Sequence, residues 1–445
     1  MKKFAKPVLI LLLLFAVIWG VKKIKDLNAM ARIGVGYMTK VACSEIFVAG
    51  RSADVVLAND FHGIDPLLEK VKLEIDESEG TVDGSLYGLG KSKAYHRSSL
   101  GCTLSPGGPP DTSGTYNTVK ADVADLPTDI NGAVQSAVDA FFTGAKADDN
   151  AVNRGVVVLQ NGTVIGEGYG EGFTRDTPQQ SWSMAKSVTQ ALFGIASQQG
   201  LVSIDETNLF PEWDGDERAK ISVNDLMHMS SGLYFLENYA DPASSVTQML
   251  FNSRDMGARA AQEPLEYEPG THWAYSSGTT NILSKLLRQR IEAAGMDYHS
   301  YPAIELFNKI GLRRPTFETD ASGTFVGSSF LYATARDWAR LGELYRNDGV
   351  WGNTPILPKG WVDYARAPAL DSTPYYGAQW WLNQDQKRLP GMAKDIFFMG
   401  GHDSQYVIVV PSKNAVIVRL GLNRPPASFE TDILPLIQGV YNALE

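Results

Sequence analysis

The pattern of apolar and polar side chains predicts regular helices and strands from about residue 130 to the C-terminus. Two β-branched runs, Gly155–Gln160 and Thr163–Ile165, flank Asn161-Gly162, which is a strong short-range signal for a β-hairpin. From Met184, apolar residues recur at i, i+4, i+8 and i+11, which predicts a helix over 183–198 with one buried face. Further helices are predicted over 134–141, 279–294, 334–346 and 429–444, and strands over 406–410 and 415–420.

Strands lie at both ends of this region and helices lie between them. This order predicts an α+β fold, in which an antiparallel sheet is flanked by helices. We therefore expect one domain over residues 130–445. Residues 26–129 are expected to form an N-terminal extension and linker, since Leu104–Thr118 is dense in Ser, Pro and Gly and is typical of a loop.

An apolar run, Pro7–Val21, lies between lysines at the N-terminus. A secretory signal peptide needs a small-residue cleavage site soon after such a run, and no Ala-x-Ala site follows directly. A membrane anchor needs about 20 apolar residues, which the run approaches if the flanking lysines extend to the membrane surface. We favour an uncleaved anchor over a cleaved signal peptide in residues 1–25. Either way the body is expected to be exported, anchored in the inner membrane facing the periplasm or secreted.

The composition narrows the classes of partner and cofactor. The chain has 445 residues with 40 Lys and Arg against 50 Asp and Glu, which gives a formal net charge of −10. An acidic body argues against nucleic acid as a partner, because binding phosphates requires a net positive face. No Cys-x-x-Cys, His-x-His or His-Glu-x-x-His spacing occurs, so we expect no metal site and no cofactor.

Cys43 and Cys102 are the two cysteines of the chain. In an exported protein one such pair favours a disulfide, and two buried free thiols are the alternative. Closing a loop of this length stabilises a fold by roughly 4 kcal/mol in the chain-entropy model. The bond is expected to brace the extension and to take no part in catalysis.

The clearest candidate chemistry is in the stretch Ser181–Lys186. On a helix, Ser183 and Lys186 lie on one face, a turn apart. A serine hydroxyl becomes an effective nucleophile when a base takes its proton, and a lysine can do so where burial lowers its pKa from about 10.4. The alternative is a surface pair of no function. This is the one Ser-x-x-Lys in the chain, and it opens an apolar helix, which favours the catalytic interpretation.

Three other segments, Leu226–Leu233, Pro269–Ser277 and Phe397–Gln405, carry motifs in the same order as in a known family. With Ser-x-x-Lys they resemble the serine β-lactamase-related family of class C β-lactamases, D-alanyl-D-alanine carboxypeptidases, some esterases and 6-aminohexanoate-dimer hydrolases. The resemblance covers about residues 130–445 and implies a β-lactamase/transpeptidase-like fold, in which an all-helical subdomain accompanies the sheet. The extension with its two cysteines is similar to that of hydrolases nearest the nylon-oligomer group.

The resemblance implies that Ser183 is the acylated nucleophile and Lys186 its proton acceptor. Tyr275 begins the second motif, and a neighbouring lysine cation is expected to lower its pKa below about 10, so that it takes the Ser183 proton and passes one to the leaving group. Ser277 stands where class C enzymes have Asn and is expected to bind substrate more weakly. The backbone N–H groups of Ser183 and Gln405 are expected to form the oxyanion hole.

The third motif, His402-Asp403-Ser404, departs from the Lys-Thr-Gly or His-x-Gly of relatives. His402 stands in place of a lysine that binds a carboxylate, and Asp403 is acidic, so tight binding of penicillin-like carboxylates is not expected. Ser404 replaces a glycine that lets substrate approach the strand, so a tighter approach is expected.

These features predict an exported serine hydrolase that forms an acyl-enzyme on Ser183 and cleaves small amides or esters, with the membrane contacted through the N-terminal segment. The alternatives are a peptidoglycan D,D-peptidase or β-lactamase, and a non-catalytic binding module of the envelope with the same fold. His228 is expected to end a helix rather than to catalyse. Trp380 and Trp381 are expected to pack in the core rather than line the site.

Overall fold

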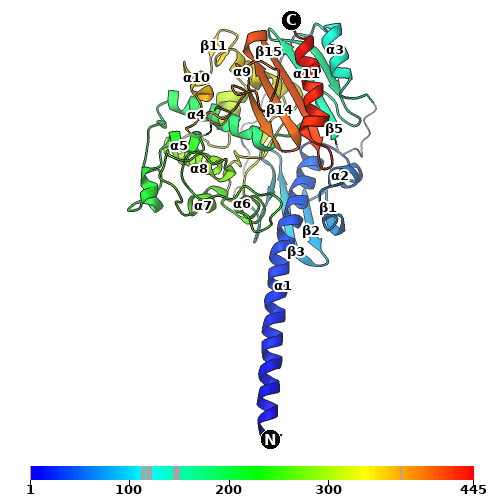
Figure 1. Cartoon of the computed structure of the whole chain (residues 1–445), viewed down its shortest axis with the longest axis vertical. Coiled ribbons are helices and arrows are strands. Elements are labelled where there is room, and N and C mark those ends of the chain that lie inside the picture. Colours follow the sequence, from blue (N-terminus) through cyan, green and yellow to red (C-terminus); the bar gives the residue numbers. More distant parts are fainter. Residues whose placement is uncertain (1, 112–115, 117–122, 144–150, 371, 373) are drawn as a thin grey trace.

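The protein is described from a computed structural model that covers residues 2–111, 116, 123–143, 151–370, 372 and 374–445, with side chains from residue 22 onward. Its centre is a six-stranded antiparallel sheet in the order β12-β13-β14-β15-β5-β6 (Figure 1). The predicted hairpin and the predicted C-terminal strands are confirmed as β5–β6 and β14–β15. The strands are β5 (Ala151–Gln160), β6 (Thr163–Tyr169), β12 (Trp381–Leu382), β13 (Phe397–Gly401), β14 (Gln405–Val410) and β15 (Ala415–Asn423).

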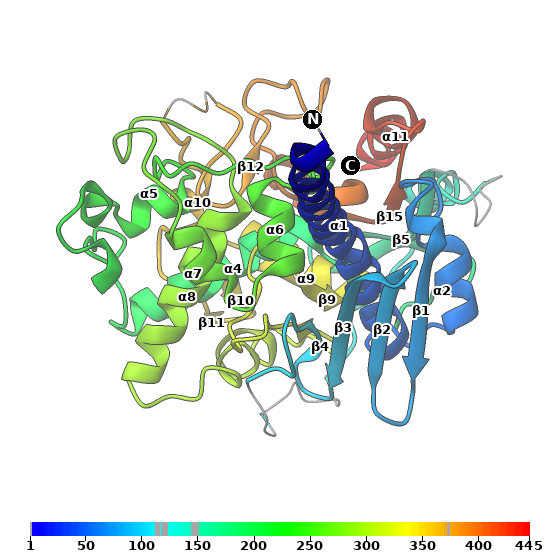
Figure 2. The ribbon, with the colours of Figure 1, turned by 90° about the horizontal axis from the view of Figure 1, so that it is seen from below.

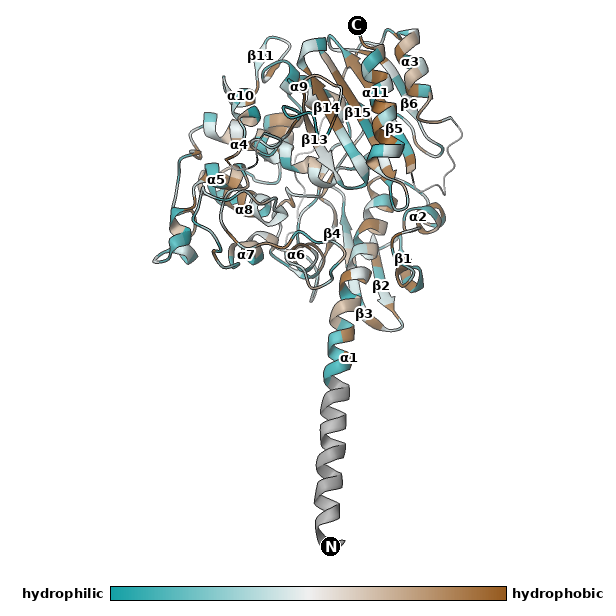
Figure 3. Cartoon of the chain, viewed as in Figure 1, coloured by the Kyte–Doolittle hydropathy of each residue, from teal (hydrophilic) through white to brown (hydrophobic). Residues whose placement is uncertain are grey.

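Both faces of this sheet are buried, and successive side chains of one strand enter different cores. Val157 and Leu159 of β5 lie in the core that includes side chains of α4 (Ala185–Gln198) and α9 (Ala335–Arg346). Val156 and Val158 lie in a second core, under α3 (Gly132–Asp139) and α11 (Leu434–Ala443). The strands are therefore apolar at consecutive positions, which Figure 3 shows as brown ribbons. Burial of each such side chain contributes about 1.5–3 kcal/mol.

A helical region lies beside the sheet and holds α4 together with four helices that the chain forms between residues 223 and 293 (Figure 1). In a small antiparallel sheet, β9 (Leu331–Ala333) pairs on one side with β7 (Gln179–Gln180), which precedes α4, and on the other side with β8 (Thr316–Phe317). The predicted α+β fold with a helical subdomain is confirmed. The remaining elements of the body are α5 (Val223–Met227), α6 (Ser245–Asn252), α7 (Met256–Ala261), α8 (Ser277–Ala293), α10 (Trp361–Arg366), β7 (Gln179–Gln180), β8 (Thr316–Phe317), β9 (Leu331–Ala333), β10 (Val350–Trp351) and β11 (Thr354–Pro355).

The N-terminal extension is more regular than the sequence analysis indicated. It consists of α1 (Lys2–Phe47), α2 (Ala53–Asn59) and a four-stranded antiparallel sheet that lies alongside α1 (Figure 2). Side chains from the end of α1, including Met38 and Ala42, belong to the same core as α4. Part of the predicted linker, residues 112–115 and 117–122, lies outside the described residues. The strands are β1 (Val71–Asp76), β2 (Thr81–Leu86), β3 (Leu89–Arg97) and β4 (Gly101–Leu104).

The predicted membrane anchor falls on residues 1–25, and the side chains of residues 1–21 lie outside the described part. In the part of the chain whose side chains are described, no helix combines the length and the apolarity needed to cross a membrane. The N-terminal portion of α1 extends away from the body (Figure 1).

The predicted disulfide is confirmed: Cys43 at the end of α1 is bonded to Cys102 of β4, with their Cα atoms 5.9 Å apart. The two residues are separated by 59 positions, so the bond closes a long loop. Replacing both cysteines by serine is expected to lower the free energy of unfolding by roughly 4 kcal/mol, because the unfolded chain regains the freedom that the loop removes. Urea unfolding with and without reductant measures this. Reductant must destabilise the wild type and leave the double variant unchanged; equal unfolding of both proteins without reductant contradicts the prediction.

Candidate active site

Ser183 lies in a short 3-10 turn, Trp182–Met184, that leads into α4. The pattern predicted the helix from Ser183, and α4 begins two residues later. The chain forms the 3-10 turn first, and Trp182 in it has a φ of +46°, which lies in the left-handed region. The turn leaves Ser183 half-buried and places Lys186 one turn further along, inside the protein.

Lys186 is 1% exposed, and three neutral oxygens surround its amine. Nζ donates hydrogen bonds to Ser183 Oγ at 3.1 Å, to Ser277 Oγ at 3.0 Å and to the carbonyl oxygen of Ser328 at 3.0 Å. These three acceptors match the three N–H bonds of an ammonium group. The predicted pairing of serine and lysine is therefore present in the structure.

Burial lowers the pKa of Lys186 from 10.5 to about 8, because the charged amine is removed from water. The carboxylate of Glu237 acts in the opposite direction and limits the shift. An amine with this pKa is partly neutral near pH 7.5, so it can accept the proton of the Ser183 hydroxyl.

Glu237 is the residue of this site that the sequence analysis missed. Its carboxylate accepts hydrogen bonds from the Ser277 hydroxyl at 2.6 Å and from the Ser277 backbone N–H at 2.8 Å, at the first turn of α8. Ser277 is fully buried and hydrogen-bonded on both sides, to Lys186 and to Glu237. The structure thus connects Ser277 to the lysine rather than to solvent. Glu237 lies in an irregular segment, and its one sequence signal is that it is the only acidic residue between Gly232 and Ala240.

Tyr275 is brought into the same site, with its ring centroid 4.9 Å from Lys186 Nζ. The expected direction of its pKa was wrong. Burial raises the pKa of Tyr275 well above 10, and the Glu237 charge raises it further, while a side-chain hydrogen bond with Ser183 only partly opposes this. The phenol is therefore neutral at physiological pH and suited to donating a proton. Of the two groups, Lys186 is the one whose pKa suits it to accept a proton.

Aromatic rings border the site on two sides. Tyr275 is stacked on Trp381 at 5.3 Å between centroids and meets Tyr376 edge to face at 5.8 Å. Trp381 is half-buried and contacts the site through this packing on Tyr275. Trp380 is fully buried against Tyr345 at 4.3 Å, as expected for a core residue.

On the other side of the site, the ring of His402 lies 5.5 Å from that of Trp182, edge to face, and is stacked on Tyr239 at 6.0 Å. The His402 side chain is 54% exposed. Tyr239 is 43% exposed, and its hydroxyl donates to Glu237 at 2.8 Å. His402 therefore borders the site from the solvent side.

The third motif forms the tight turn between β13 and β14. Asp403 and Ser404 both have positive φ, +58° and +60°, a conformation that favours glycine. The Ser404 hydroxyl accepts a hydrogen bond from Asn423 Nδ2 at 2.8 Å, so it is turned toward β15. Asp403 is buried and lies 3.5 Å from Arg424 Nε. Its charge is thereby paired inside the protein.

The backbone N–H of Gln405 donates to the carbonyl oxygen of His402 within this turn. Oxyanion binding by Gln405 would require this bond to open, and its assignment, like that of the Ser183 N–H, stays a prediction. The Gln405 side chain is buried and exchanges hydrogen bonds with the backbone of Gly421.

His228 ends α5 and bonds the carbonyl oxygen of Asn224 at 3.2 Å, so the expected structural role is confirmed. Among the described residues, no three His, Cys, Asp or Glu side chains are grouped to hold a metal ion.

The family model described as Beta-lactamase matches residues 138–438. The 6-aminohexanoate-dimer hydrolase of Paenarthrobacter ureafaciens is 25% identical over 291 residues, which cover 59% of this chain and 71% of that protein.

Two solved structures are similar in fold. One, a Bacillus anthracis protein assigned as a 6-aminohexanoate-dimer hydrolase, has a TM-score of 0.59 at 21% identity and covers 73% of this chain and 88% of its own. The other, EstCE1, a hydrolase with promiscuous acyltransferase activity, has a TM-score of 0.57 at 18% identity, with 70% and 98% covered.

Proposed function

Since this chain belongs to the beta-lactamase family of hydrolases, we propose that it hydrolyses small linear amides or esters through an acyl-enzyme on Ser183. The observation that carries the proposal is the contact between a half-buried serine and a fully buried lysine whose pKa is lowered to about 8. Burying an amine without a carboxylate in direct contact is unfavourable. A serine with a purely structural role would not need such an amine beside it, so the pair favours a catalytic role.

In the acylation step, Ser183 Oγ attacks the substrate carbonyl carbon while neutral Lys186 accepts the hydroxyl proton. The new C–O bond converts the carbonyl to a tetrahedral intermediate. When the intermediate collapses, the bond to the leaving amine or alcohol breaks and that group needs a proton. Tyr275, a neutral phenol beside Ser183, is placed to donate it, and the Lys186 ammonium replaces the phenol proton. A water molecule then attacks the acyl carbon while neutral Lys186 accepts its proton, and when the bond between the acyl carbon and Ser183 Oγ breaks, Lys186 returns that proton to Oγ and the acid product leaves.

The substrate class follows from what the third motif lacks. His402 stands where relatives have a lysine that binds a carboxylate, and the Asp403 charge is already paired with Arg424. The rings of Tyr275, Trp381 and Tyr239 offer apolar contact instead. These features favour uncharged linear acyl groups over penicillin-like carboxylates and over peptidoglycan stem peptides.

We further infer that the protein is exported. Support comes from the apolar run at Pro7–Val21 and from the disulfide, since disulfides are rare in reducing compartments.

A substrate panel tests the proposed activity: p-nitrophenyl esters, linear amides, a D-alanyl-D-alanine peptide and nitrocefin. Turnover of the esters and linear amides should exceed that of the other two by about tenfold or more, since each missing polar contact lowers transition-state binding by roughly 1–3 kcal/mol. Preferred hydrolysis of nitrocefin or of the peptide would support the β-lactamase or D,D-peptidase alternative. No turnover and no covalent labelling by a fluorophosphonate would support the non-catalytic alternative.

Replacing Tyr275 by phenylalanine is expected to lower kcat for amides by about 10²-fold or more, within the range for loss of a general acid. Esters should lose less, because an alkoxide or phenolate leaves more easily without a proton. The loss should not vary with pH below 9, since the phenol stays neutral there. The matched control is Tyr301→Phe, a buried tyrosine that donates to Gln199 near the end of α4. Equal losses for amides and esters contradict the assigned role.

A further inference from the structure

One face of α1 lies against the turn that carries the nucleophile. Tyr37, Lys40 and Ser44 follow one another at i, i+3 and i+7, so their side chains share a face of the helix. The ring of Tyr37 is stacked on that of Trp182, with centroids 6.3 Å apart and planes at 12°. Trp182 directly precedes Ser183. The extension therefore reaches the catalytic serine through a single intervening side chain.

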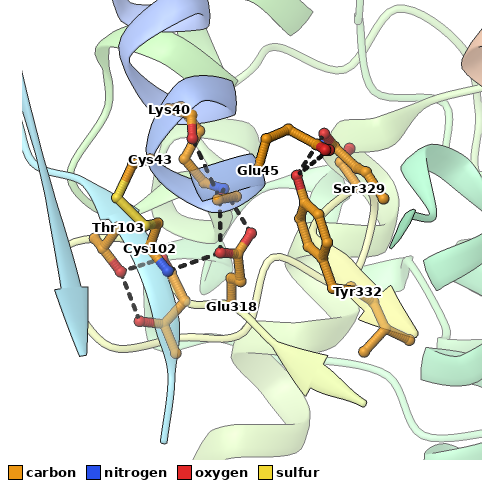
Figure 4. A network of polar contacts seen from close by, with 12 residues as sticks. Lys40, Cys43, Glu45, Cys102, Thr103, Glu318, Ser329 and Tyr332 are labelled. Carbon is orange, nitrogen blue, oxygen red and sulfur yellow. Dashed lines mark hydrogen bonds and ion pairs between the residues drawn. A yellow bond between two sulfur atoms is a disulfide. The ribbon is translucent and has the colours of Figure 1, made fainter. Parts of the chain in front are cut away.

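Lys40 and Ser44 bind the body on the same face. The Lys40 amine donates at 2.5 Å, and the Ser44 hydroxyl at 2.8 Å, to the buried carboxylate of Glu318 (Figure 4). Lys40 also lies 4.2 Å from the ring centroid of Phe330, whose ring in turn packs on Trp182 at 6.3 Å. Trp182 is thus held between α1 and the segment before β9.

The disulfide fixes α1 in this position. Cys43 lies between Lys40 and Ser44 along the chain, and its partner Cys102 donates its backbone N–H to the same Glu318 carboxylate at 2.7 Å (Figure 4).

A second contact reaches the nucleophile segment from Glu45. Its carboxylate accepts from the Tyr332 hydroxyl at 3.1 Å, and that hydroxyl is also 3.1 Å from Gln180 Oε1, three residues before Ser183.

The Trp182 backbone explains why such support is needed. A φ of +46° is strained for a residue with a large side chain, and it persists only where the surroundings impose it. The strain lies next to Ser183, so release of Trp182 would rotate the turn and move Oγ away from Lys186. The ring of Tyr37 closes one side of the Trp182 indole, and His402 lies edge to face against it.

We propose that Tyr37 is a positioning residue for Ser183, so that the N-terminal extension completes the active site. The inference rests on the proposed function. It goes beyond the family, because the family model begins at residue 138 and α1 lies outside it. Tyr37 acts through Trp182: it holds the strained turn in the one conformation in which the Ser183 hydroxyl reaches Lys186.

The test compares three variants of the full-length protein: Tyr37→Ala, Tyr37→Phe and Phe47→Ala. Phe47 is the matched control, since it is also an α1 aromatic residue but is stacked on His96 within the extension, at 5.3 Å. Two quantities are measured on each folded variant: the second-order rate of fluorophosphonate labelling at Ser183, and kcat and KM for a p-nitrophenyl ester. Thermal unfolding gives the stability of each.

Tyr37→Ala should lower the labelling rate and kcat by about 10- to 100-fold with KM little changed, because a displacement of about 1 Å at the nucleophile has an effect of this size. Tyr37→Phe should retain activity within about twofold, since the aromatic ring does the positioning. Phe47→Ala should also retain activity within about twofold, even if its melting temperature falls as much as that of Tyr37→Ala. Equal labelling by Tyr37→Ala and Phe47→Ala overturns the proposal. Should Tyr37→Ala not fold, Tyr37→Leu, which keeps apolar volume without stacking, is judged by the same criterion. A wild type that does not label at Ser183 instead refutes the proposed function.

Discussion

Ser183→Ala should abolish hydrolysis of p-nitrophenyl esters and linear amides, with kcat lowered by at least about 10⁴-fold. The Ser183 hydroxyl is the atom that bonds to the substrate, and no second hydroxyl replaces it. Ser277, the other serine bonded to the Lys186 amine, is fully buried and already hydrogen-bonded to Lys186 and Glu237. Steady-state turnover and the initial burst of p-nitrophenol both measure the effect.

The matched control is Ser197→Ala, a half-buried serine near the far end of the same helix, α4. It should retain wild-type turnover. Full activity of Ser183→Ala would show that another residue is the nucleophile, and the assignment of the site would fail. A similar loss in both variants would point to damage to α4 rather than to chemistry.

Lys186→Met should lower kcat by about 10³-fold or more, since the base that activates Ser183 is lost. The wild-type rate should fall as the pH is lowered through about 8, because the protonated amine cannot accept the serine proton. In the variant this pH dependence should disappear together with most of the activity. Initial rates of ester hydrolysis between pH 6 and pH 10 measure both effects. A wild-type profile that is flat over this range would contradict the role of Lys186.

The same substitution should remove a pH dependence of the stability of the protein. The pKa of Lys186 is about 8 when folded and 10.5 in the unfolded chain, so the unfolded state binds more protons between these values. Stability therefore rises with pH from 8 to 10.5 in the wild type, and below pH 8 the buried amine destabilises the fold by roughly 3 kcal/mol. Lys186→Met removes this difference between pH 7 and pH 10, and urea unfolding at the two pH values should show it. Lys394→Met, at an exposed lysine, is the control and should change neither rate nor stability appreciably.

Local patterns predicted the elements of the fold well where each pattern extends over many residues. The hairpin at Asn161-Gly162 and the two C-terminal strands form as predicted, because β-branched runs and turn residues act locally. The start of α4 was misplaced by two residues because a 3-10 turn, Trp182–Met184, precedes it, and the left-handed Trp182 of this turn contacts Tyr37, Phe330 and His402. Such contacts join residues far apart in sequence and leave no periodic signal.

The candidate site was predicted in part for the same reason. Motifs identified Ser183, Lys186 and Tyr275, which the structure brings together. Glu237 lies on an irregular segment without a motif, so its role was found only from its contact with Ser277. The direction of the Tyr275 pKa depends on burial, which one motif does not reveal. Likewise, Tyr37 of α1 packs against Trp182, which lies 145 positions further along the chain, and nothing in either local sequence indicates this contact.

The most direct measurement is the mass of the protein after reaction with a fluorophosphonate or a slowly hydrolysed ester, followed by peptide mapping. We expect one adduct per chain, on the peptide that contains Ser183, and its formation should slow as the pH falls below about 8. An adduct on any other residue, or none under conditions in which the protein turns over esters, would contradict it.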